Sequence, residues 1–183
     1  MGRDDRLLEQ KIDGERIYEG RILDLEVDRV LLASGNEATR EVVRHKGAVV
    51  VLPLHEDRRV EFVRQYRYPM GEILLELPAG KLDPGEEPVV CAGRELAEET
   101  GWKPTEIHEL GWFYTTPGFT DEVLHAFIAT PLEPVPNVAE DPDEAIDNVT
   151  MTVEEALDAC RSGAIRDSKT IACFLLAQLH GWI

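Results

Sequence analysis

The stretch GKLDPGEEPVVCAGRELAEETGW, from Gly80 to Trp102, begins as a loop rich in glycine and proline and continues as a helix. Pro88 suits a first helical turn and Gly101 suits the position just after a helix, so we expect a helix over 89–100. Apolar residues at three- and four-residue spacing give this helix one face to bury, namely Val89, Ala92 and Leu96. The stretch therefore predicts a loop that leads into an amphipathic helix packed on a core.

The same helix carries three glutamates near its C-terminal end, Glu95, Glu98 and Glu99. Like charges at i, i+3 and i+4 cost a few tenths of a kcal/mol, and the helix dipole disfavours anions at this end. These two penalties favour a compensating cation, and clustered carboxylate oxygens suit Mg²⁺ or Mn²⁺. A solvated acidic face, with Arg94 pairing to Glu98, is the alternative that the helix alone leaves open.

The composition is that of an ordinary globular protein, with 183 residues of which 43% are hydrophobic. This length favours one domain with a sizeable core. The net charge is -17 and uneven, because residues 1–46 carry about -2 and the remainder about -15. Nucleic-acid binding through a basic surface is therefore not expected. The acidity either keeps the protein in solution or collects divalent cations.

Targeting and redox signals indicate a cytoplasmic protein without a membrane partner. No apolar run approaches the roughly 18 residues of a membrane span, and the N-terminus MGRDDRLLEQ does not read as a secretory signal. The three cysteines, Cys91, Cys160 and Cys173, are widely spaced and form neither a metal-type pair nor a disulfide framework.

Strand patterns dominate the chain. Apolar runs or apolar/polar alternation predict strands over 17–32 (which continues or turns back as a hairpin), 40–47, 48–54, 58–68, 72–80, 107–119 and 122–132. Two further helices are expected, one over 152–163 with a Thr152/Glu155 capping signature and one over 168–183 with Ser168 as its cap. Many strands without regular βαβ alternation indicate an α+β sandwich.

The spacing within the opening stretch identifies a family. Gly80, Glu86, Arg94-Glu95-Leu96, Glu98-Glu99 and Gly101-Trp102 match every fixed position of the Nudix box, G-x5-E-x7-R-E-U-x-E-E-x-G-U, in which U is a bulky apolar residue. The sequence resembles the Nudix hydrolase family. The resemblance implies a Nudix-like α/β/α sandwich with a mixed sheet over 47–183, with the box at 80–102. It also implies a preceding β-hairpin region over 1–46 that takes part in dimerisation.

The resemblance implies a metal-dependent pyrophosphohydrolase that uses two or more Mg²⁺ or Mn²⁺ ions. Glu95 and Glu99 are the expected metal ligands, with Glu98 as a nearby or water-mediated participant at the metal, and the carbonyl of Ala79 is a further ligand. Glu98 and Glu99 are also the expected catalytic residues of the box. Glu86 and Arg94 are expected to form a structural ion pair that locks the loop onto the helix.

Flanking motifs extend the resemblance to the ADP-ribose pyrophosphatase subgroup over roughly 17–178, including RQYRYP, LELPAGKLDPGE and FYTTPGFTDE. This implies hydrolysis of ADP-ribose to AMP and ribose 5-phosphate. Another nucleoside diphosphate sugar and a non-catalytic nucleotide-sensing module are the alternatives. The resemblance gives five substrate-binding candidates, Arg67, Arg40, Glu76, Arg21 and Ile22. Of these, Arg67 offers a planar fork suited to phosphate oxygens.

Several of these positions have a plainer interpretation. Arg67 is otherwise a surface cation and Ile22 a core residue. Tyr66, Tyr68 and Trp112 could stack on a base, but we expect each to pack in the core.

The acidic segment 133–148 departs from the family pattern. Alignment through it puts Glu144 at a catalytic, metal-ligating position. The residue two places earlier, where relatives often carry a catalytic glutamate, is Pro142, which cannot act as a base. Glu140, Asp141 and Asp143 therefore stay open as candidates for the general base.

The segment 17–32 is unusually apolar for a region that precedes the domain proper, and an isolated hairpin is marginally stable in water. Either the domain's own core covers it, or a second copy does. The resemblance favours a second copy, and we expect a homodimer in which this region approaches the nucleotide base.

Overall fold

The protein is described by a computed structural model over residues 5–136 and 145–183. It forms two compact units, one made of the residues up to 46 together with 114–123, and the other of residues 47–113 with 124–183. After a short 3₁₀ turn at Asp5–Leu7, the first unit contains an antiparallel sheet of three strands: β1 (Glu9–Glu19), β2 (Leu23–Leu32) and β3 (Glu37–His45).

The N-terminal region is more extended than a single hairpin. The predicted strand over 17–32 turns back after Glu19, and β1 begins at Glu9, where the sequence EQKIDGERIYE shows little apolar alternation. Every residue of β1 is exposed, so pairing with β2 rather than burial forms this strand. The segment 114–123 lies against β3, where the N–H of Val43 donates to the carbonyl of Phe119 at 2.7 Å. This connection was not predicted.

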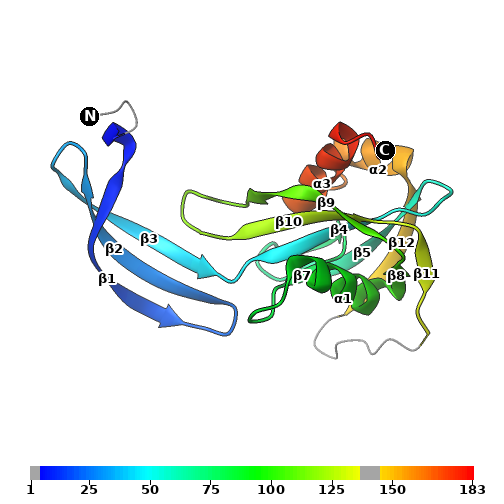
Figure 1. Cartoon of the computed structure of the whole chain (residues 1–183), viewed down its shortest axis with the longest axis horizontal. Helices are drawn as coiled ribbons and strands as arrows, with labels where there is room; N and C mark the ends of the chain where they lie inside the picture. Colours follow the sequence, from blue (N-terminus) through cyan, green and yellow to red (C-terminus); the bar gives the residue numbers. More distant parts are fainter. Residues whose placement is uncertain (1–4, 137–144) are drawn as a thin grey trace. The chain divides into compact units, whose positions relative to one another are not determined.

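The second unit has a mixed sheet between helices (Figure 1). Its strand order is β7 (Ala79–Lys81), β4 (Ala48–Pro53), β10 (Val123–Ala129) and β9 (Ile107–Tyr114), and β10 runs parallel to β4 whereas β7 runs antiparallel. Helix α1 (Pro88–Thr100) covers one face, and helices α2 (Val153–Ser162) and α3 (Ser168–Leu179) cover the other. The predicted α/β/α sandwich is confirmed.

Strand β4 is buried along its whole length because both of its faces meet a core. Val49 and Val51 pack with Ala92 and Leu96 of α1. Val50 and Leu52 belong to the larger cluster on the other face, together with Ala156 of α2 and Phe174 of α3. A strand between two helical layers is apolar throughout, which explains the uninterrupted run AVVVLP.

A second, antiparallel sheet has the order β12 (Ile146–Thr152), β5 (Arg59–Arg67) and β6 (Glu72–Glu76). A short antiparallel pair joins β8 (Trp102–Pro104) to β11 (Leu132–Pro134). The prediction of one strand over 72–80 is wrong, because β6 and β7 lie in different sheets. Pro78 separates them, since it has no N–H for a ladder, and its carbonyl accepts the N–H of Val51 at 2.9 Å.

The helix ends follow local chemistry. Helix α1 begins at Pro88, one residue before the predicted start, and ends at Thr100 as predicted, with Gly101 after it in the left-handed region with φ of 72°. The Thr152/Glu155 capping box of α2 is confirmed. The cap predicted for α3 is wrong by one residue, because Asp167 rather than Ser168 accepts the N–H of Thr170. None of the helices in the described part of the chain is long and apolar enough to cross a membrane.

Candidate functional site

Arg94 joins the loop of the opening stretch to its helix. Its Nε and Nη2 donate to the two carboxylate oxygens of Glu86 at 3.0 and 2.9 Å. Its Nη1 donates to Glu95 at 2.8 Å and to Glu98 at 3.0 Å. The predicted ion pair between Glu86 and Arg94 is confirmed, and the same guanidinium also neutralises part of the acidic cluster.

The fork from Arg94 keeps Glu86 ionised. Hydrogen bonds from Arg94, and next from the backbone N–H of Asp83, lower the pKa of Glu86 to about 2. Burial, and next the negative charge of Glu86, raise the pKa of the neighbouring Cys91 thiol to about 12. Cys91 is therefore a neutral side chain, buried in the core cluster beside Ala92 and Leu96.

Two glutamates of α1 meet consecutive residues of β7. A Cβ built on Gly80 would lie 1.8 Å from Cδ of Glu95, so only glycine leaves room for that carboxylate over the strand. The N–H of Ala79 donates to Oε2 of Glu99 at 3.1 Å. The first glycine of the box and the last glutamates of the helix are thus parts of one strand-to-helix contact.

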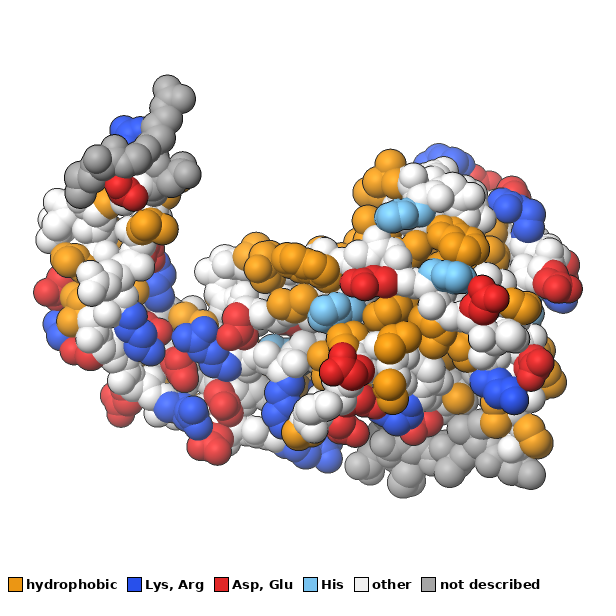
Figure 2. All heavy atoms as spheres, in the orientation of Figure 1, with side chains coloured by type: hydrophobic (Ala, Val, Ile, Leu, Met, Phe, Trp, Pro, Cys, Tyr) orange, Lys and Arg blue, Asp and Glu red, His pale blue; other side chains and the backbone are white. Residues whose placement is uncertain are grey.

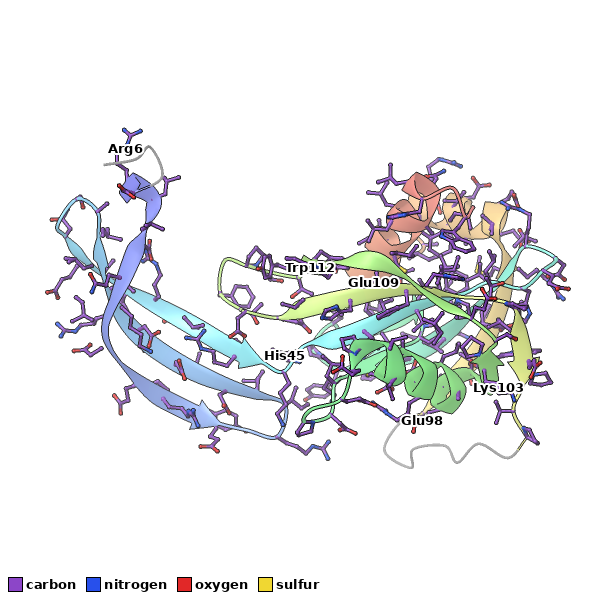
Figure 3. All side chains as sticks on the ribbon, viewed as in Figure 1. Arg6, His45, Glu98, Lys103, Glu109 and Trp112 are labelled. Atoms are coloured by element: carbon purple, nitrogen blue, oxygen red, sulfur yellow. The ribbon has the colours of Figure 1, made fainter. Side chains whose placement is uncertain are left out.

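The donor set at this contact is all oxygen, which fits a hard divalent cation. Glu95 and Glu99 bring two carboxylates to the backbone of Ala79 and Gly80 in β7. Glu98 lies on the outer side of α1, with 46% of its side chain exposed (Figure 3). In residues 5–136 and 145–183, no three His, Cys, Asp or Glu side chains converge on one point, and Arg94 binds Glu95 and Glu98.

The segment that carries the predicted catalytic Glu144 lies outside the described residues, as do the alternative bases Glu140, Asp141 and Asp143. These assignments stay predictions.

Arg67 and Glu76 meet as a bidentate pair between β5 and β6. Nε and Nη2 of Arg67 donate to the carboxylate of Glu76 at 2.8 and 2.6 Å. The side chain of Glu76 is only 1% exposed, whereas that of Arg67 is 38% exposed. Of these two substrate-binding candidates, Arg67 is the one that faces solvent, and Glu76 lies beneath it.

Lys169 also contacts Glu76 and was missed from the sequence. The signal that could have found it is its position in the first turn of a helix, where the dipole disfavours a cation. A lysine there needs an acidic partner from elsewhere in the fold.

The remaining substrate-binding candidates belong to the N-terminal unit. Arg40 on β3 pairs with Glu9 on β1. Arg21 and Ile22 lie in the turn between β1 and β2, and both are exposed. The alternative of a core role for Ile22 is therefore wrong, because this turn has no layer over it within the unit.

The expectation that Tyr66, Tyr68 and Trp112 pack in the core is wrong, since all three are more than half exposed. Tyr66 sits opposite Ile73 at the far end of the β5–β6 hairpin, and Tyr68 follows in its turn. Trp112 projects from β9, an edge strand of the central sheet (Figure 3). Aromatic residues in strand patterns predict burial, but the ends and edges of strands leave these three side chains uncovered.

The comparisons with known proteins agree with the box geometry. A family model described as a NUDIX domain matches residues 43–173, so the chain belongs to the Nudix family. The protein is a Nudix pyrophosphohydrolase, as its sequence predicted.

Its curated relatives have different names. The chain is 42% identical to a methanol dehydrogenase activator of Bacillus methanolicus, with 96% of each chain covered. It is 40% identical to an ADP-ribose pyrophosphatase of Bacillus subtilis (strain 168), with 94% of each covered. It is 37% identical to a GDP-mannose pyrophosphatase of Cronobacter sakazakii over 77% of this chain and 82% of that protein.

A solved structure of an ADP compounds hydrolase supports the fold. It superposes with a TM-score of 0.82 at 19% identity and covers 96% of this chain and 97% of its own. At this identity the likeness extends to the fold alone.

The close approach of Glu95 to β7 yields a prediction for Gly80→Ala. The added methyl group must displace the Glu95 carboxylate, which is the end of a flexible side chain, so the protein should fold while its affinity for Mn²⁺ falls by about 10- to 100-fold. Mn²⁺ binding followed by electron paramagnetic resonance measures this. Gly93→Ala in α1 is the matched control, because its Cβ would meet only Ile107 at an ordinary 3.5 Å. Equal Mn²⁺ affinity in both variants would contradict the site.

The lowered pKa of Glu86 predicts how Glu86→Gln responds to pH. A carboxyl with a folded pKa of about 2 stabilises the fold above its ordinary pKa near 4.5, and this contribution disappears as the pH falls toward 2. Glu86→Gln should therefore be less stable than the wild type at pH 7, and the difference should shrink between pH 4.5 and 2. Urea unfolding across this range measures it, with the exposed neighbour Glu87→Gln as control. A difference independent of pH would count against the ion pair.

Proposed function

We propose that the protein hydrolyses ADP-ribose to AMP and ribose 5-phosphate with the help of Mg²⁺ or Mn²⁺. Water adds to one phosphorus and the bridging P–O bond breaks, so that each product keeps one phosphate. The observation that carries the proposal is the meeting of Glu95 and Glu99 with consecutive residues of β7. The choice of ADP-ribose as the substrate is supported by the relative at 40% identity over 94% of both chains, an ADP-ribose pyrophosphatase.

Each residue has a distinct part in this proposal. Glu95, Glu99 and the carbonyl of Ala79 would hold the cations, with Glu98 beside them and Glu144 as a further ligand and catalytic group. Bound divalent cations supply charge neutralisation of the pyrophosphate and an activated water. Arg67 directs its exposed guanidinium at a phosphate or ribose oxygen, which a planar fork recognises well. Glu86 and Arg94 keep the loop on α1 and do not touch the substrate.

Two alternatives remain. The GDP-mannose pyrophosphatase among the relatives supports a hexose conjugate as the substrate. A nucleotide-sensing module without catalysis would not need the Glu95, Glu98 and Glu99 set that this chain retains.

A substrate panel tests the proposal. With Mg²⁺ present, ADP-ribose should be hydrolysed at a higher kcat/KM than GDP-mannose, with release of AMP measured by chromatography. Chelation should abolish turnover, because the carboxylates of the site repel a bare pyrophosphate. Glu99→Gln, which keeps side-chain size but removes a charge, should lower turnover at least about 100-fold. Full activity after exhaustive chelation would overturn the dependence on a divalent cation. A higher kcat/KM for GDP-mannose would overturn ADP-ribose as the preferred substrate.

We further propose that the protein is a homodimer joined through its N-terminal sheet, and that Arg21 and Ile22 of each copy serve the substrate site of the partner. In that sheet Tyr18, Leu25 and Val43 are cross-strand neighbours on one face, whereas Asp24 and Glu26 lie on the other. Large apolar side chains are exposed on these strands and on the turns beside them, among charged ones (Figure 2): Leu7, Leu8, Ile12, Ile17, Tyr18, Ile22, Leu23 and Leu31. A second copy would cover them.

Sedimentation tests the dimer. The intact protein should sediment at about twice its chain mass of 20.6 kDa. Deletion of residues 1–32 should leave a monomer or an insoluble protein with little activity. Ile17→Glu should weaken association, whereas Leu175→Glu, an equally exposed apolar site on α3, should not. A fully active monomer at micromolar concentration would refute the proposal.

A further inference from the structure

Lys169 occupies a position where a helix disfavours it. It lies in the first turn of α3, next to the positive end of the dipole, and yet only 16% of its side chain is exposed. Its ammonium group contacts the carboxylate of Glu76 and lies 3.0 Å from that of Asp167. Two carboxylates therefore offset both the dipole and the loss of water.

The start of α3 is fixed rigidly against the end of β6. Thr170 is completely buried, and its hydroxyl accepts the N–H of Leu77 at 2.9 Å while it donates to Asp167 at 2.6 Å. Asp167 also caps the helix. Lys169 thus has little freedom relative to Glu76, which is the residue directly before Leu77.

Glu76 is a buried carboxylate held by two cations. Its Oε1 accepts Nε of Arg67, and its Oε2 accepts both Nη2 of Arg67 and the ammonium group of Lys169. Burial alone would raise the pKa of Glu76, but the hydrogen bond from Arg67 and the charge of Lys169 outweigh it, and the pKa is lowered. Glu76 is therefore ionised and has one fixed orientation.

This arrangement leaves one edge of Arg67 for a ligand. Two of its five N–H groups bind Glu76, and among the described residues its Nη1 makes no hydrogen bond. The pKa of Arg67 is raised first by the hydrogen bond to Glu76, and to a smaller extent by the charges of Asp167 and Glu99. Arg67 therefore lies within electrostatic reach of the glutamate that we assign to the cation site.

We propose that Lys169 is a positioning residue for substrate binding. It holds Glu76 in place, and Glu76 in turn orients the free edge of Arg67 toward a phosphate or ribose oxygen of the nucleoside diphosphate substrate. The inference rests on the substrate contact that the proposed function gives to Arg67.

Charge balance explains why Lys169 matters for an anionic substrate. Arg67 and Lys169 together neutralise Glu76 and Asp167. Without Lys169 the set has a net charge of -1, and Arg67 becomes the sole cationic partner of a buried carboxylate. The guanidinium of Arg67 would then interact more strongly with Glu76 and bind the substrate more weakly. The loss should appear in substrate affinity rather than in turnover, because Arg67 binds the ground state and the transition state alike.

The experiment compares three variants under Mg²⁺ with ADP-ribose. Lys169→Met should raise KM about 10-fold with kcat within about threefold of the wild type, and Lys169→Arg should restore KM to within about threefold. Arg166→Met is the matched control, since Arg166 pairs with the exposed Glu72 and so also links the start of α3 to β6. If α3 docking alone mattered, Arg166→Met would show the same rise in KM.

A double-mutant comparison with Arg67 distinguishes a positioning role of Lys169 from a general loss of structure. In an Arg67→Met background, Lys169→Met should change KM less than about twofold, because the residue it orients is already gone. Circular dichroism and thermal melts check folding, and Lys169→Gln, which keeps a donor for Glu76, replaces Lys169→Met if that variant does not fold. An unchanged KM in a folded variant, or a KM rise that persists without Arg67, would overturn the inference.

A binding measurement keeps this test distinct from that of the proposed function. Calorimetry with an ADP-ribose analogue carrying a methylene bridge between its phosphorus atoms reports affinity without hydrolysis. Tight binding by wild type and weak binding by Lys169→Met would support the positioning role even if hydrolysis of ADP-ribose failed. Equal binding by the two proteins would overturn it even if hydrolysis succeeded.

Discussion

The guanidinium group of Arg94 holds the loop and helix of the Nudix box together, and the rest of the site depends on it. It forms a bidentate pair with Glu86 and at the same time reaches Glu95 and Glu98 one turn apart on α1. Without this cation, three carboxylates would repel each other at the negative end of a helix dipole. Charge-assisted hydrogen bonds from a guanidinium are directional as well as strong. They therefore hold the loop and the acidic side of α1 in one relative placement.

Placement of α1 against β7 is the second constraint. The chain leaves one sheet at Glu76 and enters another at Ala79, with Leu77 buried and Pro78 at the crossing. Gly80 then lets a glutamate carboxylate lie directly over the strand, where a side chain of any size would collide with it. The backbone geometry at Gly80 therefore brings the glutamates of α1 close to β7. The packing of Val49 and Val51 against α1 keeps the helix at this distance from the sheet.

Two helices of this protein carry charge at the unfavourable end. Helix α1 has glutamates near its C-terminus, and α3 has Lys169 in its first turn. In both cases partners from other elements offset the penalty: Arg94 and the strand β7 for the first, and Glu76 and Asp167 for the second. A charge that is unfavourable in its own helix, and that other elements compensate, indicates a position chosen for the site. Stability alone would not place it there.

The sequence by itself determined the family, because the box has a fixed spacing along one continuous segment, and the α/β/α arrangement followed from that family resemblance. The ends of α1, the capping box of α2 and the ion pair between Glu86 and Arg94 were all predictable from neighbours within about ten residues. Hydrogen-bonding and dipole rules act over that range, so a linear pattern is enough to find them.

Only the tertiary structure decided which segments far apart in the sequence contact each other. Lys169 and Glu76 are separated by 93 residues, and no local pattern links them. The split between β6 and β7, the addition of 114–123 to the N-terminal unit and the exposure of Tyr66, Tyr68 and Trp112 likewise depend on which sheet or edge each segment joins. Burial is a property of neighbours in space, and a strand's own alternation does not reveal whether a layer covers it.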